Sequence, residues 1–232
     1  MVNGLNLVGV GLYTTAEAAR LTAIPASKLV RWLNGHNAHG VHYAPLWKPQ
    51  INLDDGHTYL GFRDLMEARV ANEFINLGIS PQRVRAAILL AQEIVNDERP
   101  LSTHKFKTDG KAIFLQILQA DEQGTEAERL INLFSKQYNF SAIVAPLLKD
   151  VETDEAGAPS KWWPLGRSKK IVLDPLYSFG QPIDAVSYVP TAILANAAKY
   201  HGIDTAARDY EVPKSSVVRA VEFERMELKA AA

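Results

Sequence analysis

The sequence predicts a mainly α-helical chain with small β elements, an α+β fold that begins with a winged helix-turn-helix. Residues 12–33 have the pattern of two short helices, the first with a capping box at its start, and residues 62–96 hold two long stretches of helical apolar periodicity. Residues 191–229 contain a second pattern of a short helix, a turn and a longer helix. We therefore expect, in chain order, the helix-turn-helix, a helical hairpin, a small β segment and a C-terminal three-helix unit.

The first helix pair spans Leu12 to Leu33. Thr14 and Glu17 have the spacing of a capping box, in which the two side chains satisfy free amides at a helix start. Thr22-Ala23 forms the turn, and Pro25 suits the first turn of the second helix, where a missing amide proton costs nothing. The side chains expected to pack back on the first helix are Ile24, Leu29, Trp32 and Leu33.

The opposite face of the second helix is the candidate DNA-binding face. Lys28 and Arg31 point outward there, beside the small side chains of Ala26 and Ser27, which allow close approach to a duplex. Lysine contacts phosphates, and arginine can bond a guanine edge through two hydrogen bonds. Arg20 on the first helix is a further candidate for a contact with the DNA backbone. The alternative interpretation is a solvated helix face without a ligand.

The segment that follows, Asn34 to Tyr59, is polar and aromatic, and we expect a short wing beside the helices. Asp54-Asp55-Gly56 has the composition of a hairpin turn, so residues 46–52 and 57–61 are the predicted strands. Phosphate contacts from this wing would come from Lys48, Gln50 and His57.

Two sets of side chains near the wing have both a structural and a functional interpretation. Trp32 and Trp47 could stack on bases, but Trp32 falls on the apolar stripe of its helix, which favours core packing. Imidazole is a common metal ligand, and three histidines lie three residues apart at His36, His39 and His42. Their segment is rich in Asn and Gly and is not predicted to be helical, so we expect no metal site.

A long helix is predicted over Phe62 to Leu77. Gly78 ends it as a left-handed C-cap, Ser80 caps the next helix, and Pro81 opens that helix, which runs to about Asn96. We expect this helical hairpin to supply core and also a dimer contact, because proteins that read two-fold operators are themselves two-fold. The stripe of the first helix consists of Phe62, Leu65, Met66, Val70, Phe74 and Leu77.

The apolar periodicity changes several times in the remainder. We expect a β-hairpin over Leu101 to Leu118 with its turn at Asp109-Gly110, a helix over 126–138, strands at 143–149 and 171–173, and an acidic linker over 152–160. The C-terminal helices are predicted at 191–200, at 204–210 with Asp204 as the cap, and at 214–229. The predicted domains are the helix-turn-helix (1–61), the dimerisation hairpin (62–99), a mixed α/β segment (100–165) and the C-terminal helical domain (166–232).

Composition excludes several classes of function. The formal net charge is −1, so any nucleic-acid site must be a local patch, and the absence of cysteine excludes disulfides and thiolate sites. The sequence has no signal-peptide pattern and no apolar run of about 18 residues, so we expect a cytoplasmic protein that does not enter a membrane. No Gly-rich phosphate loop, nucleophile elbow or His-Glu-x-x-His motif is present, so we expect neither catalysis nor a cofactor.

A second group of side chains is the candidate contact with a protein partner. Trp162 and Trp163 are adjacent, so in an extended segment one should face the core and the other a partner. The alternative is that both pack inside the chain and that each arginine is only solvated. The basic candidates are Arg167, which clusters with Lys169 and Lys170, and then Arg208, Arg219 and Arg225.

Taken in order, these segments resemble one group of VapB-type antitoxins. Residues 13–33 resemble a MerR-type helix-turn-helix, and the resemblance covers about residues 12–228. Ala23 and Pro25 depart from the Gly and the capping Ser that are usual there, and Ser187-Tyr188 stand where other members carry an Arg. The further matching segments are 59–70, 78–86, 106–111, 162–166, 171–175, 179–182, 201–203, 210–212 and 217–224.

The resemblance implies an antitoxin of a type II toxin–antitoxin pair. Such a protein binds double-stranded operator DNA, represses its own operon and blocks a PIN-like ribonuclease toxin, and we expect it to act as a homodimer. Carboxylates hold divalent metal in PIN-like active sites, so an Arg or Lys of the antitoxin could take the metal's place. Two alternatives stay open: a MerR-like ligand-responsive transcriptional regulator without a toxin, with residues 100–180 as effector domain, and an adaptor that binds only proteins.

Overall fold

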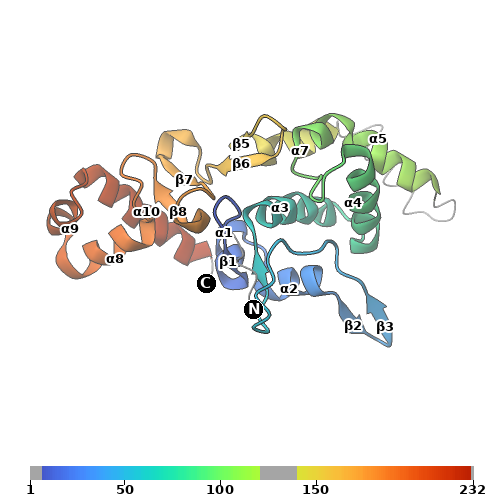
Figure 1. The fold of residues 1–232 in the computed structure, drawn as a ribbon, viewed down its shortest axis with the longest axis horizontal. Helices are drawn as coiled ribbons and strands as arrows, with labels where there is room; N and C mark the ends of the chain where they lie inside the picture. Colours follow the sequence, from blue (N-terminus) through green and yellow to red (C-terminus); the bar gives the residue numbers. More distant parts are fainter. Residues whose placement is uncertain (1–6, 121–139, 231–232) are drawn as a thin grey trace.

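The computed structural model describes residues 7–120 and 140–230. Within these ranges the chain is mainly helical with small antiparallel sheets, as predicted. The molecule is elongated, with α3 across its centre, α4 and α5 towards one end and α8 to α10 at the other (Figure 1).

The helices are α1 (Thr15–Thr22), α2 (Ala26–Asn34), α3 (Phe62–Asn76), α4 (Pro81–Val95), α5 (His104–Ala120), α7 (Phe140–Leu148), α8 (Thr191–His201), α9 (Ile203–Asp209) and α10 (Lys214–Ala230). The strands are β1 (Tyr13–Thr14), β2 (His36–Ala38), β3 (Val41–Tyr43), β4 (Tyr59–Leu60), β5 (Val151–Thr153), β6 (Pro159–Trp162), β7 (Ile171–Leu173) and β8 (Pro182–Asp184).

A two-stranded ladder joins the start of α1 to the start of α3. β1 pairs antiparallel with β4, with Tyr13 opposite Leu60. The Phe62 N–H extends this ladder by donating to the Val10 carbonyl at 2.7 Å. The ladder therefore brackets α1 and α2 and holds them against the central helix.

Helix α3 forms the core of the molecule. The predicted helix over 62–77 is confirmed, and Ser80 caps α4 as expected, with its side chain accepting from the Arg83 N–H. Helices α1, α4 and α7 pack around α3, and most of its apolar stripe is less than 2% exposed. The stripe is therefore internal to one chain, and the prediction that it also forms a dimer contact is wrong. Apolar periodicity shows that a face is covered, but it does not show whether the cover belongs to the same chain.

Four phenylalanines from three helices fill the space beside α3. Phe74 of α3 lies 4.6 Å from Phe114 and 5.7 Å from Phe140, measured between ring centroids, and Phe106 completes the cluster. The cluster requires helices at 104–120 and 140–148, so the β-hairpin predicted over 101–118 and the strand predicted at 143–149 are both wrong. Gly110 is needed for packing within a helix and not for a turn, because an added Cβ would lie 2.7 Å from Cε1 of Phe140.

The predicted linker over 152–160 is a β-hairpin. Strands β5 and β6 flank a turn in which the Gly157 N–H donates to the Asp154 carbonyl at 3.0 Å, and they continue into a four-stranded sheet in the order β5-β6-β7-β8. Strand β7 at 171–173 is confirmed, whereas β8 was not predicted. The acidic and Gly-containing composition belongs to the hairpin turn and not to a linker. The helix predicted over 126–138 lies outside the described residues.

The C-terminal helices α8, α9 and α10 enclose a small apolar cluster of their own, centred on Leu194 and Val217. All three predicted helices are confirmed, except that Gly202 is the N-cap of α9 and the predicted cap, Asp204, lies in its first turn. An ion pair of 2.7 Å between Arg219 on α10 and the fully buried Asp184 of β8 fixes the unit on the sheet. No helix in the described ranges is long and apolar enough to cross a bilayer.

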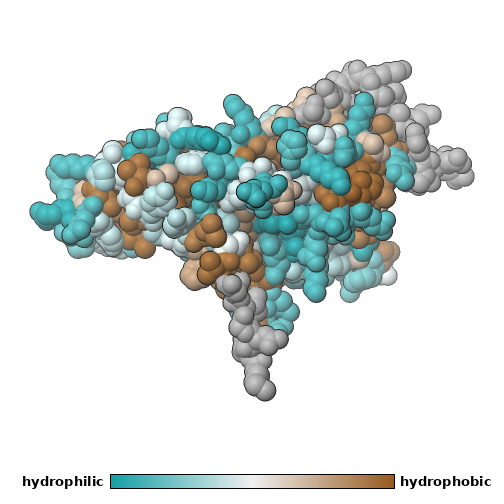
Figure 2. Space-filling model, turned by 45° about the horizontal axis from the view of Figure 1, so that its top comes forward, coloured by the Kyte–Doolittle hydropathy of each residue, from teal (hydrophilic) through white to brown (hydrophobic). Residues whose placement is uncertain are grey.

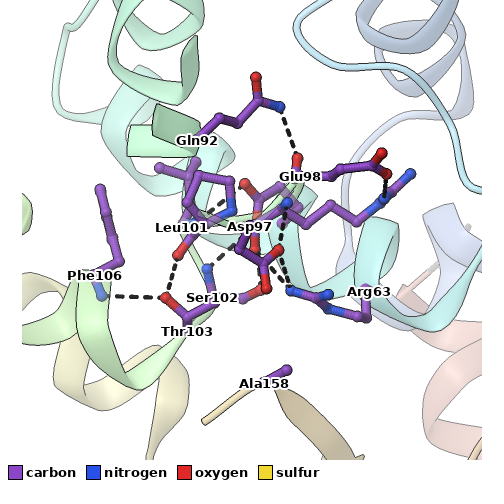
Figure 3. Close-up of polar contacts among 12 residues, drawn as sticks. Arg63, Gln92, Asp97, Glu98, Leu101, Ser102, Thr103, Phe106 and Ala158 are labelled. Atoms are coloured by element: carbon purple, nitrogen blue, oxygen red, sulfur yellow. Dashed lines mark hydrogen bonds and ion pairs between the residues drawn. The ribbon is translucent and has the colours of Figure 1, made fainter. Parts of the chain in front are cut away.

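A buried polar network joins α3 to the connector between α4 and α5 (Figure 3). Arg63 donates from Nη2 to Oδ1 of Asp97 at 2.6 Å. The fully buried carboxyl group of Glu67 accepts hydrogen bonds from the backbone and from the hydroxyl of Ser102, both at 3.2 Å. These hydrogen bonds and the Arg63–Asp97 ion pair therefore hold this connector on the central helix.

Candidate nucleic-acid interface

Helix α1 begins with the predicted capping box. Glu17 N–H donates to Oγ1 of Thr14 at 3.2 Å, and the Glu17 carboxylate accepts from the Thr14 N–H at 2.8 Å. The helix ends at Ala23, whose φ of 57° is left-handed. A non-glycine residue adopts this conformation at a cost of about 1 kcal/mol, so alanine makes the turn that the sequence pattern predicted at slightly lower stability than glycine would.

Helix α2 follows after a short connection. Pro25 is its N-cap and not its first helical residue, and the Pro25 carbonyl accepts from the N–H groups of Lys28 and Leu29. Leu29, Trp32 and Leu33 are buried against the rest of the chain, so the predicted packing face is confirmed. The core position predicted for Trp47 is confirmed as well.

The outer face of α2 differs in one residue from the prediction. Ser27 and Arg31 are exposed, and Ala26 is half-buried between them and the core. Lys28 is turned sideways: its Nζ donates to Oδ1 of Asn72 on α3 at 2.8 Å and lies 4.9 Å from the centroid of the Trp32 ring. Burial, and after it the charge of Arg31, lowers the pKa of Lys28. Arg31 is therefore the cation that α2 presents to solvent, without a hydrogen-bond or ion-pair partner in the described ranges.

Arg20 on α1 is bound within the chain. Its Nη1 lies 2.9 Å from Oε2 of Glu224 on α10, and both side chains are less than a quarter exposed. The other carboxylate oxygen of Glu224 accepts from the Thr191 hydroxyl at 2.6 Å. This arrangement connects α1 to the C-terminal helices, which favours a structural role for Arg20 over the predicted DNA contact.

A hairpin stands beside α2, but it is formed by residues other than the predicted ones. β2 and β3 pair antiparallel over residues 36–43, directly after α2, whereas residues 46–52 form no strand and Tyr59–Leu60 pairs with β1. The Asp54-Asp55-Gly56 turn exists, but Ile51 before it and Leu60 after it are buried in the core. Lys48 and His57 are exposed, while Gln50 accepts from the Arg63 N–H at 3.1 Å and so helps to begin α3.

The three histidines of the hairpin lie in different surroundings. The His36 ring stacks on Tyr43 at 4.9 Å, and Nδ1 of His42 lies 2.9 Å from Oδ1 of Asn37. His39 occupies the tip, with a φ of 49°. Across residues 7–120 and 140–230 no three metal-ligating side chains come together.

Of the two adjacent tryptophans, Trp162 faces the core as predicted, and the partner contact predicted for the other stays a prediction. Trp162 is 5% exposed and its ring lies 4.2 Å from the guanidinium of Arg69, so burial removes it from the candidate partner contacts. Trp163 is half-buried and its Nε1 donates to Glu152 at 2.9 Å, while Arg167 lies 3.2 Å from the same carboxylate.

The other three basic candidates lie on or beside α9 and α10. Arg219 is bound to buried Asp184; burial acts to raise the pKa of that carboxyl, but hydrogen bonds from Ser216 and Arg219 offset it and the pKa is lowered. Arg208 is exposed beside Asp209, at 3.6 Å. Arg225 is exposed and has no ion pair in the described parts of the chain.

The loops that flank β8 carry an exposed hydrophobic surface that was not predicted from the sequence. We call it the β7–β8 rim; its residues are between 45% and 65% exposed and comprise Leu176, Tyr177, Phe179, Val186 and Tyr188. Phe179 and Tyr188 have φ values of 54° and 58°, and the Phe179 carbonyl accepts from the Leu12 N–H at 2.8 Å. Figure 2 shows hydrophobic residues gathered where the N-terminal segment meets this loop. Left-handed backbone cannot be predicted from these residue types, so the signal in the sequence was weak and consisted of the two aromatic residues Tyr177 and Phe179.

Comparison with family profiles finds no match. The chain is 27% identical over 186 residues to a Mycobacterium tuberculosis protein named "Putative antitoxin VapB45", which covers 75% of this chain and 77% of that protein. The crystal structure of Rv2018 from Mycobacterium tuberculosis matches with a TM-score of 0.69 and 25% identity, over 90% of this chain and 96% of that one. The chain is a distant homologue of these proteins. The comparison therefore supports the antitoxin part of the sequence interpretation and the overall fold.

Proposed function

We propose that this chain is the antitoxin of a type II toxin–antitoxin pair, that it binds operator DNA as a homodimer and that it blocks a PIN-like ribonuclease without catalysing a reaction itself. The distant homology to a protein named as a VapB antitoxin supports the class. The helix-turn-helix role of α1 and α2 rests on one observation. Arg31 is exposed, has no ion-pair or hydrogen-bond partner among residues 7–120 and 140–230, and stands on a helix whose opposite face is fixed in the core.

DNA recognition by α2 needs a rigid helix and a small number of side chains free to reach base edges. Leu29, Trp32 and Leu33 supply the rigidity, because they are at most 6% exposed. Ser27 and Arg31 are four positions apart in the sequence and therefore lie on one exposed face of the helix. Lys28 is held by Asn72, so its contribution is expected to be smaller than that of Arg31.

Replacing Arg31 with Ala is expected to weaken binding to a duplex from the region upstream of this chain's gene by about tenfold or more, the range of one good charged contact to a base edge or a phosphate. Lys28→Ala should weaken it less. Fluorescence anisotropy at fixed salt measures both, with Lys111→Ala on α5 as a control that removes an exposed cation elsewhere. Equal affinities of wild type and Arg31→Ala would remove α2 from the proposed DNA interface.

We further propose that the toxin contacts the β7–β8 rim. Aromatic side chains on a fixed backbone make effective interface anchors, because little conformational entropy is lost when they bind. Lys169 and Lys170 are exposed beside the rim, and the Lys170 carbonyl accepts from the Ala185 N–H at 2.8 Å. A hydrophobic centre with cationic neighbours complements a ribonuclease whose active-site opening is lined by carboxylates.

Phe179→Ser should therefore weaken the complex with the ribonuclease encoded next to this gene by about thirtyfold, which corresponds to the loss of one anchor of roughly 2 kcal/mol. Isothermal titration calorimetry with the purified toxin and growth rescue on co-expression give two independent readings. Leu89→Ser is the matched control, since Leu89 is 42% exposed and belongs to α4, which lies on the opposite side of α3 from β7 and β8 (Figure 1). Unchanged affinity in Phe179→Ser would place the toxin contact on another surface.

A further inference from the structure

A cavity of about 170 Å³ opens beside α2 at the base of the β2–β3 hairpin. Three parts of the fold line it: Arg31 from α2, the stacked rings of His36 and Tyr43 from the hairpin, and Pro81 and Arg85 from the start of α4. The volume is several times the roughly 30 Å³ that one water molecule occupies in the liquid. The cavity is therefore large enough for a phosphate group.

The lining of the cavity is largely apolar, and its two charged side chains are those of Arg31 and Arg85. Neither Arg31 nor Arg85 forms an ion pair with any described residue, and no carboxylate is among the lining side chains. Nε of Arg85 donates to the Pro45 carbonyl at 2.8 Å, which holds the guanidinium at the cavity and leaves its other donors for a ligand. Two arginines without acidic partners repel each other, so an anion between them would be stabilising.

Two more features favour an anion there. Pro81 and Gln82 of the first turn of α4 line the cavity, so the partial positive charge of a 15-residue helix is directed toward it. His36 also lines the cavity, and its buried Nδ1 has no hydrogen-bond partner in the described residues. A buried polar atom without a partner requires an explanation, and a bound acceptor or donor supplies one.

We propose that this cavity binds one backbone phosphate of the DNA duplex, with Arg31 and Arg85 as the two cationic donors. The inference rests on the proposed DNA-binding function and adds to it a contact from α4, a helix outside the α1–α2 pair. Because Arg31 belongs both to the cavity and to the exposed face of α2, the phosphate would fix the position of that face along the groove.

The salt dependence of binding tests this assignment directly. Each phosphate neutralised adds about 0.9 to the negative slope of log K against log salt concentration. We expect Arg85→Ala to weaken binding of the upstream duplex about tenfold and to make the slope less negative by up to about 0.9. Both effects should be the same for a duplex of scrambled sequence, because a phosphate contact carries no sequence information. Arg31→Ala should lower the slope in the same way, and since both arginines serve one phosphate, the double variant should lose about 0.9 in total and not twice that value.

The controls separate this inference from the function on which it rests. Lys111→Ala should leave the slope unchanged. Thermal unfolding of Arg85→Ala checks that loss of the Arg85–Pro45 hydrogen bond has not unfolded the protein. Arg31→Ala does not carry this risk, because Arg31 is exposed. A wild-type chain that binds no DNA would overturn both proposals. If the wild type binds DNA and the slope is unchanged in Arg85→Ala, the proposed phosphate site is wrong and the proposed DNA binding is not. The same conclusion follows if the double variant changes the slope by about twice 0.9. Tight binding of inorganic phosphate by calorimetry, with an unchanged DNA slope in Arg85→Ala, would assign the cavity to free phosphate and also overturn the inference.

Discussion

Replacing Asp64 with Ala is expected to lower the free energy of unfolding by about 3–5 kcal/mol, the cost of removing one partner of a buried ion pair. Asp64 is fully buried on α3, and its Oδ1 accepts from Nε of Arg99 at 2.6 Å and from Nε1 of Trp47 at 3.0 Å. Its Oδ2 accepts from the backbone N–H groups of Gln50 at 2.8 Å and Gly61 at 3.0 Å. The alanine variant would leave the guanidinium of Arg99 without its buried counter-charge and three further donors without an acceptor.

Arg99 offers an internal control for this prediction. Glu98 binds the same guanidinium at 3.0 Å, but its side chain is 87% exposed. Exposed pairs contribute at most about 1 kcal/mol, so Glu98→Ala should have a small effect. Urea denaturation followed by tryptophan fluorescence measures both variants. Similar losses in the two variants would show that burial of the Asp64 pair is not what makes it stabilising.

The sequence predicted those elements whose signals are local. The capping box of Thr14 and Glu17, the apolar stripe of α3 and the Ser80-Pro81 start of α4 all depend on residues within a few positions of each other, and each was found where expected. Helix α5 was missed for the same reason. Asp109-Gly110 has the local composition of a turn, and only the Phe140 ring against Gly110 shows that a helix needs glycine there.

The difference between local signals and contacts that are distant in sequence also applies to the candidate DNA-binding face. Arg31 is exposed as predicted, because its position follows from the stripe of its own helix. Lys28 and Arg20 are bound by Asn72 and Glu224, which lie 44 and 204 residues away in the chain. Arg85 joins Arg31 through packing of α4 against the hairpin base, and no local pattern indicates that contact. Partners that are distant in sequence thus decide which cations remain free.

Glu67 gives the second large effect, on the pH dependence of stability. Its carboxyl group is fully buried on α3 and accepts hydrogen bonds from the N–H of Leu101 at 3.0 Å and from the N–H and hydroxyl of Ser102. Burial raises the pKa of Glu67 to about 8, and the opposing effects of these hydrogen bonds and of the Arg63 charge do not offset it. The folded protein therefore holds a proton on Glu67 at neutral pH, whereas the unfolded chain, with an ordinary pKa of 4.5, does not.

The sign of the effect follows from this raised pKa. The contribution of protonated Glu67 to the free energy of unfolding is complete below pH 4.5 and is lost as the pH rises through about 8. Between these values Glu67 is ionised only in the unfolded chain, and the contribution falls by about 1.4 kcal/mol per pH unit. Glu67→Gln cannot ionise, so the stability of wild type relative to this variant should fall steeply between pH 5 and pH 8 and level off above that. Urea denaturation at each pH measures the difference, and Glu98→Gln, at an exposed site of the same connector, should show no such fall. Parallel pH curves for wild type and Glu67→Gln would mean that Glu67 is ionised in the folded state, and that its three hydrogen bonds outweigh its burial.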